Sequence, residues 1–167
     1  MTKKGSVGLN LGIGAAIGYG ASWVMDQATG WYLERQSKTS RRREDEIEPG
    51  GTPVLAGRKL ASWVGRDVAD DEAARIGFIV HRSLGVTYGM TAAALARTGA
   101  RPVRAGITTG ATAYVLVDEG VVSTLFTPPP WAYPIESHLR GAIGHLAYGA
   151  AAGAMLAATH RLGALGS

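Results

Sequence analysis

The chain is 167 residues long, with 46% hydrophobic residues, 24 glycines, no cysteine and a formal net charge of +4. This length suits one domain, residues 1–167. The absence of cysteine excludes disulfides, thiolate metal sites and a cysteine nucleophile. The modest positive charge, without basic residues interleaved with aromatic ones, predicts no nucleic-acid partner.

Four apolar segments rich in glycine and alanine cover most of the chain, at about residues 7–33, 73–96, 102–126 and 138–162. Each is long enough to cross a membrane, because about 20 helical residues span the ~30 Å hydrocarbon layer. Glycine costs a soluble helix about 1 kcal/mol relative to alanine, whereas in a bilayer it lets helices approach closely. The segments therefore predict an all-α, polytopic membrane protein with four transmembrane helices, the first too long to be a cleavable signal.

Residues 34–72 differ from these segments and hold nine of the 13 acidic residues. The charged run and the Gly/Pro breakers within 41–53 predict a solvated loop. Residues 54–64 alternate apolar and basic side chains at helical spacing, which predicts a short amphipathic helix that either lies in the membrane interface or caps the bundle. Asp70 or Asp71 is expected to cap the second span.

The shorter connections determine the expected orientation. Residues 97–102 predict a tight turn, and the proline-rich residues 127–134 predict a stiff connector. Lys and Arg occur near the N-terminus and within 97–104 but are absent from 127–137, which favours a cytoplasmic N-terminus. The eight Lys and Arg of residues 34–72 point the other way.

Glycine recurs at four-residue spacing in every apolar segment, which places it along one ridge of each helix. Such ridges of small residues are where membrane helices pack. In the second and fourth segments the ridge also carries a histidine, and in the first and third it ends in an aspartate. The glycines expected at helix contacts are Gly14, Gly18, Gly77, Gly85, Gly89, Gly106, Gly110, Gly141, Gly149 and Gly153.

The order of these helices indicates an internal repeat. Along the chain it runs Asp26, His81, Asp118, His145, as expected for a helical hairpin that occurs twice. Because each repeat contains two spans, its copies should point the same way, related by a pseudo-two-fold axis along the membrane normal.

The ionisable residues inside the spans are expected at one depth, about 10–12 Å into the membrane at ~1.5 Å per residue. We expect each aspartate to face a histidine, either within its own repeat or in the swapped arrangement, and Arg82 to face Glu119. The predicted buried polar layer consists of Asp26, His81, Arg82, Asp118, Glu119 and His145.

Charges inside a span are costly and mark function by default, and three roles are open for this layer. It fixes the register of the helices, passes or senses protons or small ions, or holds a haem or pigment through His81 and His145, because axial imidazoles beside flat glycine surfaces suit a porphyrin. The neighbouring acids and arginine argue against the last role. Arg140, near the end of its span, is expected to extend to the interface.

No catalytic residue and no metal site is predicted, since the familiar hydrolase, metalloprotease and nucleotide-binding motifs are absent from the sequence. Apart from the haem alternative, no cofactor is expected.

Five stretches form a recognisable pattern: Trp23–Asp26, the arginine-rich run that ends in a proline, His81–Gly89, Val117–Gly120 and Tyr133–Gly149. In these stretches the chain resembles the YagU-like family of bacterial inner-membrane proteins, and the likeness covers most of its length. The resemblance implies a polytopic inner-membrane protein of a family without an established biochemical activity. It implies no catalytic residues.

We therefore expect a non-enzymatic integral protein of the bacterial inner membrane, surrounded by the lipid bilayer. The leading hypothesis is that its polar layer passes or senses protons or small ions, as a homo-oligomer. The main alternative is a structural accessory subunit of a larger membrane complex, and a haem- or pigment-binding protein is the third.

Overall fold

A computed structural model describes residues 3–120 and 124–162, with side chains from residue 10 onward. Across these residues the protein is helical and contains no strand, so the predicted all-α class is confirmed. Three parts of the sequence-based expectations lie outside the described residues. They are positions 121–123 of the third expected span, the two chain ends, and the Lys3 and Lys4 side chains used for orientation.

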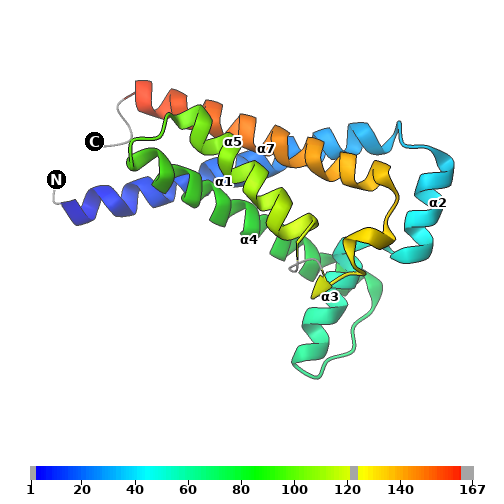
Figure 1. Cartoon of the computed structure of the whole chain (residues 1–167). Helices are drawn as coiled ribbons and strands as arrows, with labels where there is room; N and C mark the ends of the chain where they lie inside the picture. Colours follow the sequence, from blue (N-terminus) through cyan, green and yellow to red (C-terminus); the bar gives the residue numbers. More distant parts are fainter. Residues whose placement is uncertain (1–2, 121–123, 163–167) are drawn as a thin grey trace.

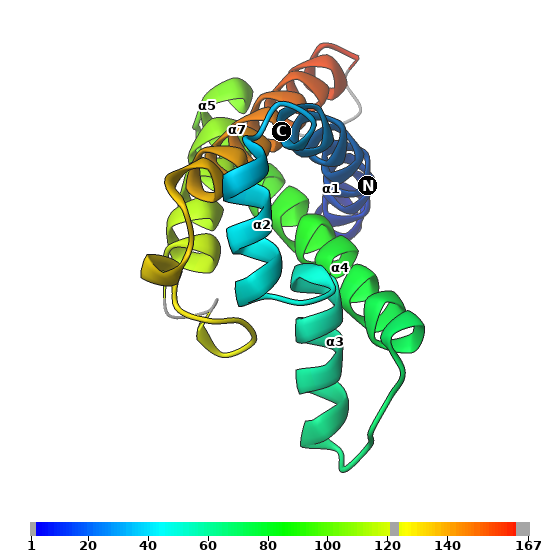
Figure 2. The same cartoon turned by 90° about the vertical axis from the view of Figure 1, so that its right-hand side faces the viewer.

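Four helices form an elongated bundle, shown in Figure 1: α1 (Lys3–Leu33), α4 (Asp70–Arg97), α5 (Pro102–Ala113) and α7 (Ile135–Arg161). Both ends of the chain and the α4–α5 turn lie at one end of this bundle. The helices that follow α1 and the connector that precedes α7 lie at the other, which we call the loop end. In Figure 2, α7 lies between α5 and α1 while α4 crosses below them.

Charges and breakers explain where the helices begin and end. The acidic residues 70–72 occupy the first turn of α4, where they complement the helix dipole. Its N-cap is Ala69, so neither expected aspartate is the cap. Gly99 adopts a left-handed φ of 98° after α4, and Pro102 opens α5, where its missing N–H is not needed.

The glycine ridges join α1 to α4 and α5 to α7 at backbone distance. A Cβ added to Gly14 would lie 2.9 Å from the Cα of Met90, and one added to Gly149 would lie 2.8 Å from the carbonyl oxygen of Gly106. Such distances leave no room for a larger residue. The same holds at the remaining backbone contacts of the two helix pairs, made by Gly18, Gly89, Gly106, Gly110 and Gly153, whereas Gly85 lies against the side chain of Ser22.

Two of the expected packing glycines have other neighbours. Gly77 lies against the backbone of Pro53, in the segment between the first and second long helices. A Cβ on Gly141 would lie 2.6 Å from Oδ2 of Asp118 rather than near another backbone. These two glycines therefore make room for a loop helix and for a side chain, not for a second span.

Small residues fill the bundle, and large apolar residues cover its outside. Ala21, Ala92 and Ala152 are fully buried, and only Tyr148 and Leu156 add large apolar side chains at that depth among the described residues. By contrast, several of the largest side chains are more than half exposed, namely Tyr19, Trp23, Trp31, Phe78, Ile79, Val115 and Leu116.

The predicted loop within residues 41–53 is wrong, because this part of the chain is mostly helical. It contains α2 (Lys38–Ile47) and the start of α3 (Gly51–Trp63). Ser37 caps α2, and Arg42 pairs with Glu46 one turn later, 3.2 Å apart. The breakers lie at the junction of the two helices, where Gly50 and Gly51 are both left-handed and Pro53 falls in the first turn of α3.

The spans agree with the expectation only in part. Of the described residues, one helix, α7, is long and apolar enough to cross a membrane by length and composition. The third expected span is also shorter than predicted: α5 has 12 residues, and a π-helical turn, Tyr114–Asp118, extends it by five.

Candidate functional site

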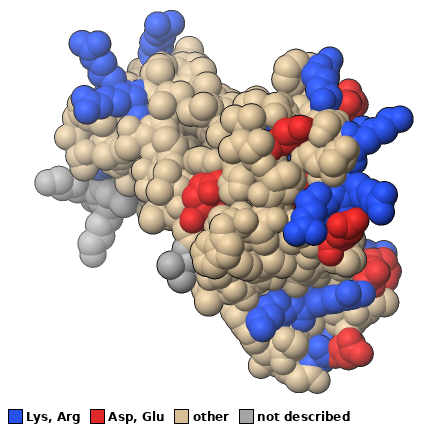
Figure 3. All heavy atoms as spheres, turned by 45° about the vertical axis from the view of Figure 1, so that its right-hand side comes forward, with Lys and Arg blue, Asp and Glu red and all other residues tan. Residues whose placement is uncertain are grey.

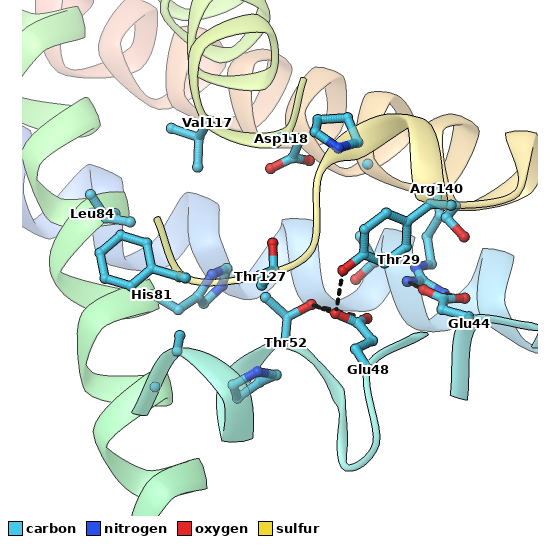
Figure 4. A pocket seen from close by; sticks show the side chains of 18 of the residues that line it. Thr29, Glu44, Glu48, Thr52, His81, Leu84, Val117, Asp118, Thr127 and Arg140 are labelled. Carbon is cyan, nitrogen blue, oxygen red and sulfur yellow. Dashed lines mark hydrogen bonds and ion pairs between the residues drawn. The ribbon is translucent and has the colours of Figure 1, made fainter. Parts of the chain in front are cut away.

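A cavity of about 420 Å³ lies at the loop end, where both helix pairs meet α2, α3 and the connector before α7 (Figure 4). Its walls are largely apolar, and ionisable side chains reach it from α2 and from both helix pairs, whereas α3 and the connector contribute uncharged residues. We call it the acidic cavity after the five carboxylates that line it: Asp26, Glu44, Glu48, Asp118 and Glu119.

The α1–α4 pair brings three of the predicted residues together. Asp26 Oδ1 lies 3.1 Å from Nε2 of His81, and Oδ2 accepts a hydrogen bond from Arg82. The guanidinium also lies over the ring of Tyr19, 5.6 Å from its centre. Because one arginine and one imidazole contact it, the Asp26 carboxylate is held from two sides.

The α5–α7 pair repeats the aspartate–histidine contact. Asp118 Oδ1 lies 3.3 Å from Nε2 of His145, and the ring of Tyr114 lies 6.0 Å from that imidazole. His145 is buried, while about one third of the Asp118 side chain is exposed. Of the two arrangements left open by the sequence, the structure thus has the one within each repeat.

The expected Arg82–Glu119 pair is absent from the described contacts. Glu119 follows the π-helical turn, and its Oε1 instead accepts a hydrogen bond from the Tyr114 hydroxyl at 2.6 Å. The same oxygen lies 2.6 Å from Nδ1 of His138. Repeat symmetry fails here because α5 changes its winding just before Glu119, which turns that side chain toward α7.

Arg140 was expected to extend to the interface, and this is wrong. Its guanidinium pairs with the Glu44 carboxylate of α2 and donates a hydrogen bond of 2.9 Å to Oε1 of Gln36. Glu44 is only 6% exposed, and a carboxylate at that depth needs a charged partner. The ion pair therefore fixes α2 across the start of α7, as Figure 4 shows from inside the cavity.

Glu48, at the end of α2, connects the two halves of the loop end. It accepts hydrogen bonds from the hydroxyls of Thr52, at 3.0 Å, and Tyr133, at 3.1 Å. Burial raises the pKa of the Glu48 carboxyl above its ordinary value, although the two hydroxyls oppose this effect. Burial and, after it, the charge of the neighbouring Glu48 carboxylate raise the pKa of the Tyr133 phenol.

Sequence reasoning missed the part of the site that α2 contributes. A signal was present, since Gln36, Ser40, Glu44 and Glu48 recur at four-residue spacing and all four are buried. This polar ridge was overlooked because it overlaps a run of charged residues that is typical of a solvated loop. His138 was missed because it stands at the predicted end of a span, where a polar side chain needs no explanation.

The described apolar core lies between the acidic cavity and the opposite end of the bundle. Next to Met25, at the cavity wall, Ile17, Tyr148 and Leu156 pack together with alanines and are all buried. Beyond them, the Asn10 side chain is 2% exposed and its amide has no hydrogen-bond partner among the described residues. We therefore see polar groups at both ends and an apolar layer between them.

The chemistry open to the acidic cavity is that of protons and cations. No group of three or more His, Cys, Asp or Glu in the described part of the chain could hold a metal ion. Nε2 of both His81 and His145 faces a carboxylate, so neither imidazole presents that nitrogen to a haem iron. Imidazole is the side chain whose charge ordinarily changes near neutral pH, and each pair places one imidazole against a carboxylate.

Comparison with known proteins adds no assignment to this picture: the chain matches no family model, no curated protein and no solved structure.

Proposed function

We propose that the chain is a non-enzymatic integral membrane protein whose acidic cavity senses protons or small cations. The placement of small residues inside the bundle and large apolar residues on its surface supports the membrane setting. Alanine and glycine fill the bundle, whereas Trp23 and Ile79 are at least 60% exposed. Soluble monomers rarely expose such apolar faces, and small residues at the contacts are typical of membrane helix bundles.

The proposal keeps the four-span arrangement with two hairpins in parallel. Its support is that α1–α4 and α5–α7 make equivalent glycine contacts and equivalent aspartate–histidine contacts. The distribution of charge agrees with it. Figure 3 shows Lys and Arg at both ends of the molecule, and the face between them carries acidic side chains but no Lys or Arg. We propose the inner membrane as the location, with the N-terminus in the cytoplasm, in line with the resemblance to the YagU-like family.

One observation carries the functional part of the proposal: each hairpin brings an aspartate–histidine pair to the same cavity, which Asp26, His81 and Asp118 line, while His145 is buried behind Asp118. Ionisable groups inside a membrane domain are expensive and are kept for a purpose. Sensing is favoured over passage because the apolar core of Ile17, Tyr148 and Leu156 lies beyond the cavity. Protonation then changes the attraction between hairpins without moving charge across the membrane.

Thiol labelling tests the membrane setting, and the cysteine-free chain is suited to it. Leu146 and Leu162 lie on or at the end of the same helix, and both are at least half exposed. In inside-out membrane vesicles, which expose the proposed cytoplasmic side, we expect a membrane-impermeant maleimide to label Leu162→Cys at least about ten times faster than Leu146→Cys, because lipid covers residue 146. Equal rates would refute the membrane setting. Ala56→Cys, in the cavity wall, should be labelled from the loop side.

Reconstituted protein tests sensing against passage. Proteoliposomes with an internal pH dye and an imposed potential should show no more proton flux than empty liposomes. The melting temperature in detergent should vary between about pH 5 and pH 8 and vary less in His81→Asn/His145→Asn, because imidazole titrates in that range. Flux that disappears in the double variant would establish passage instead. A melting temperature equally dependent on pH in both proteins would exclude the histidines as sensors.

An accessory-subunit role is the second candidate, and the exposed ridge of Tyr19, Trp23 and Trp31 on α1 favours it. Copurification from cross-linked membranes tests this role. A stoichiometric protein partner that is lost in Trp23→Ala would support it.

A further inference from the structure

Four of the five carboxylates in the acidic cavity each have two ion-pair or hydrogen-bond partners within the chain. The partners are Arg82 and His81 for Asp26, Arg140 and Gln36 for Glu44, Thr52 and Tyr133 for Glu48, and Tyr114 and His138 for Glu119. Each of these carboxylates is therefore part of the scaffold that holds the loop end together.

Asp118 is the fifth carboxylate and is placed differently. It has no arginine or lysine partner in the ion pairs that the structure describes, and it faces His145 alone among them. About one third of its side chain is exposed, and it lines the cavity. With the histidines neutral, the cavity thus has a carboxylate that no fixed cation neutralises.

Gly141 gives this carboxylate its place in the cavity wall. A Cβ at residue 141 would lie 2.6 Å from Asp118 Oδ2 and 3.2 Å from the Tyr114 ring. Any larger residue would push the carboxylate away from its present position. The equivalent glycine of the other hairpin, Gly77, instead receives a loop helix. The Asp26 side chain is exposed to nearly the same extent as that of Asp118, so the two aspartates differ in their cationic partners and not in their access to the cavity.

The rest of the cavity suits a carbon skeleton. Its volume of about 420 Å³ falls within the range of about 300–1,000 Å³ that is typical of small-molecule sites. Phe78, Leu84, Val117 and Phe126 contribute apolar walls. Figure 4 shows His81 and Leu84 at one side of this space and Glu44, Glu48 and Arg140 at the other.

We infer that the acidic cavity binds an organic ammonium ion, with the charged group at Asp118 and a compact apolar body against Leu84, Val117 and Phe78. A single carboxylate without an arginine or lysine partner, in a largely apolar cavity, matches such a ligand, because it neutralises one charge while the walls bury the body. A bare divalent ion fits less well, since no described group of three ligands is available to it. The inference rests on the proposed function and names the chemical class of the small cation, an organic ammonium ion.

The test is a binding titration of the purified full chain with 2-phenylethylammonium, followed by calorimetry. Two controls divide the ligand into its parts: 2-phenylethanol has the body without the charge, and ethylammonium has the charge without most of the body. Saturable binding of the first compound, at least about tenfold tighter than either control, is the expected result. Equal binding of 2-phenylethanol would show mere partition into detergent and would overturn the inference.

Three variants locate the site. Asp118→Asn should weaken binding of the ammonium probe by about tenfold or more, since it removes the charge. Leu84→Trp keeps every charge and should weaken it by filling the cavity, which guards against a folding defect in the first variant. Asp71→Asn, an exposed acid on α4 outside the cavity, is the matched control and should bind normally. Unchanged affinity in both folded cavity variants would contradict the assignment.

The two proposals fail separately. If thiol labelling refutes the membrane setting, the titration still decides whether the cavity takes an ammonium ion. If the titration fails while the melting temperature depends on the two histidines, proton sensing stands and the ligand class falls.

Discussion

The two hairpins of this molecule pack alike but end differently. In α1–α4 and in α5–α7, glycines bring two helix backbones into contact, and an aspartate meets a histidine at the loop end. The first helix of the first hairpin continues past its aspartate to Leu33. The first helix of the second hairpin loosens into a π-helical turn that ends at Asp118.

The two aspartates also differ in their charged partners, because the repeat counterpart of Arg82 on α7 is Leu146. Asp26 is held by an arginine from the helix it packs on, whereas Asp118 has no such partner among the described residues. Short π-helical turns inside α-helices are frequent at functional sites. The comparison therefore indicates that the first hairpin provides an aspartate held by an arginine, and the second provides an aspartate that no arginine or lysine contacts among the described residues.

Glycine-to-alanine substitutions at the helix contacts should have the largest effect on stability, and the effect should be equal in the two hairpins. Gly89→Ala and Gly153→Ala are equivalent by repeat, and each places a Cβ into the backbone of the facing helix. We expect each to destabilise the fold by about 3 kcal/mol, measured by denaturant unfolding in mixed micelles. Gly12→Ala, which has open space around it, should be neutral or stabilising. A large loss in one hairpin alone would break the packing equivalence.

Replacing the aspartate of each hairpin by leucine should reduce stability by different amounts. Asp26→Leu leaves the partly buried Arg82 without its carboxylate and should cost about 2 kcal/mol. Asp118→Leu leaves only a histidine, which can become neutral, and should cost clearly less. Glu34→Leu, at an exposed site, is the control. If Asp118→Leu reduces the folded yield more than Asp26→Leu does, the conclusion that Asp26 is the more strongly held of the two aspartates is contradicted.

A smaller effect should come from the residues one turn before each aspartate. Tyr114→Phe removes the hydroxyl that donates to Glu119, and we expect a loss of about 1 kcal/mol. Ser22→Ala, its repeat equivalent, removes a bond within one helix to the carbonyl of Gly18, and should change stability by less than about 0.5 kcal/mol. Thermal unfolding of the two variants side by side decides this; equal losses would mean that the π-helical turn needs no support from Tyr114.

The smallest expected effect concerns Glu48, which joins the loop ends of the two hairpins. Because burial raises its pKa in the folded protein, wild-type stability is greatest with the acid protonated and declines as the pH rises above the ordinary value of about 4.5. Glu48→Gln cannot ionise. Its melting temperature relative to wild type should therefore increase from about pH 4 to about pH 8. A difference that is constant with pH would show that Glu48 does not ionise in this range.

The sequence was sufficient to predict the long helices and most of their glycine contacts, and it limited the partner of each aspartate to one of two histidines. These features depend on spacing along one helix, and helical spacing is visible in a sequence. The pairing of Asp26 with His81 follows because ridges that carry Gly18 and Gly85 must face each other to let the backbones touch. Whether the polar layer has a function stays a prediction.

The part of the site that joins distant segments could not be predicted in this way. Arg82 was assigned to Glu119 because the π-helical turn, which redirects that glutamate, leaves no mark in local composition. Glu44 and Arg140 are 96 residues apart in the sequence, and each alone looks like an ordinary surface charge. Their contact depends on how α2 folds back, which is decided by tertiary packing.

The shortness of α5 has a consequence for the lipids around it. With its π-helical turn it comprises 17 residues, Pro102–Asp118, or about 25 Å at ~1.5 Å per residue, against a hydrocarbon thickness of ~30 Å. In the proposed membrane setting, this hydrophobic mismatch thins the bilayer beside α5. Headgroups and water then descend toward Asp118 on that side only, so the protein would give its cavity an entrance by shaping the membrane rather than by opening a channel through itself.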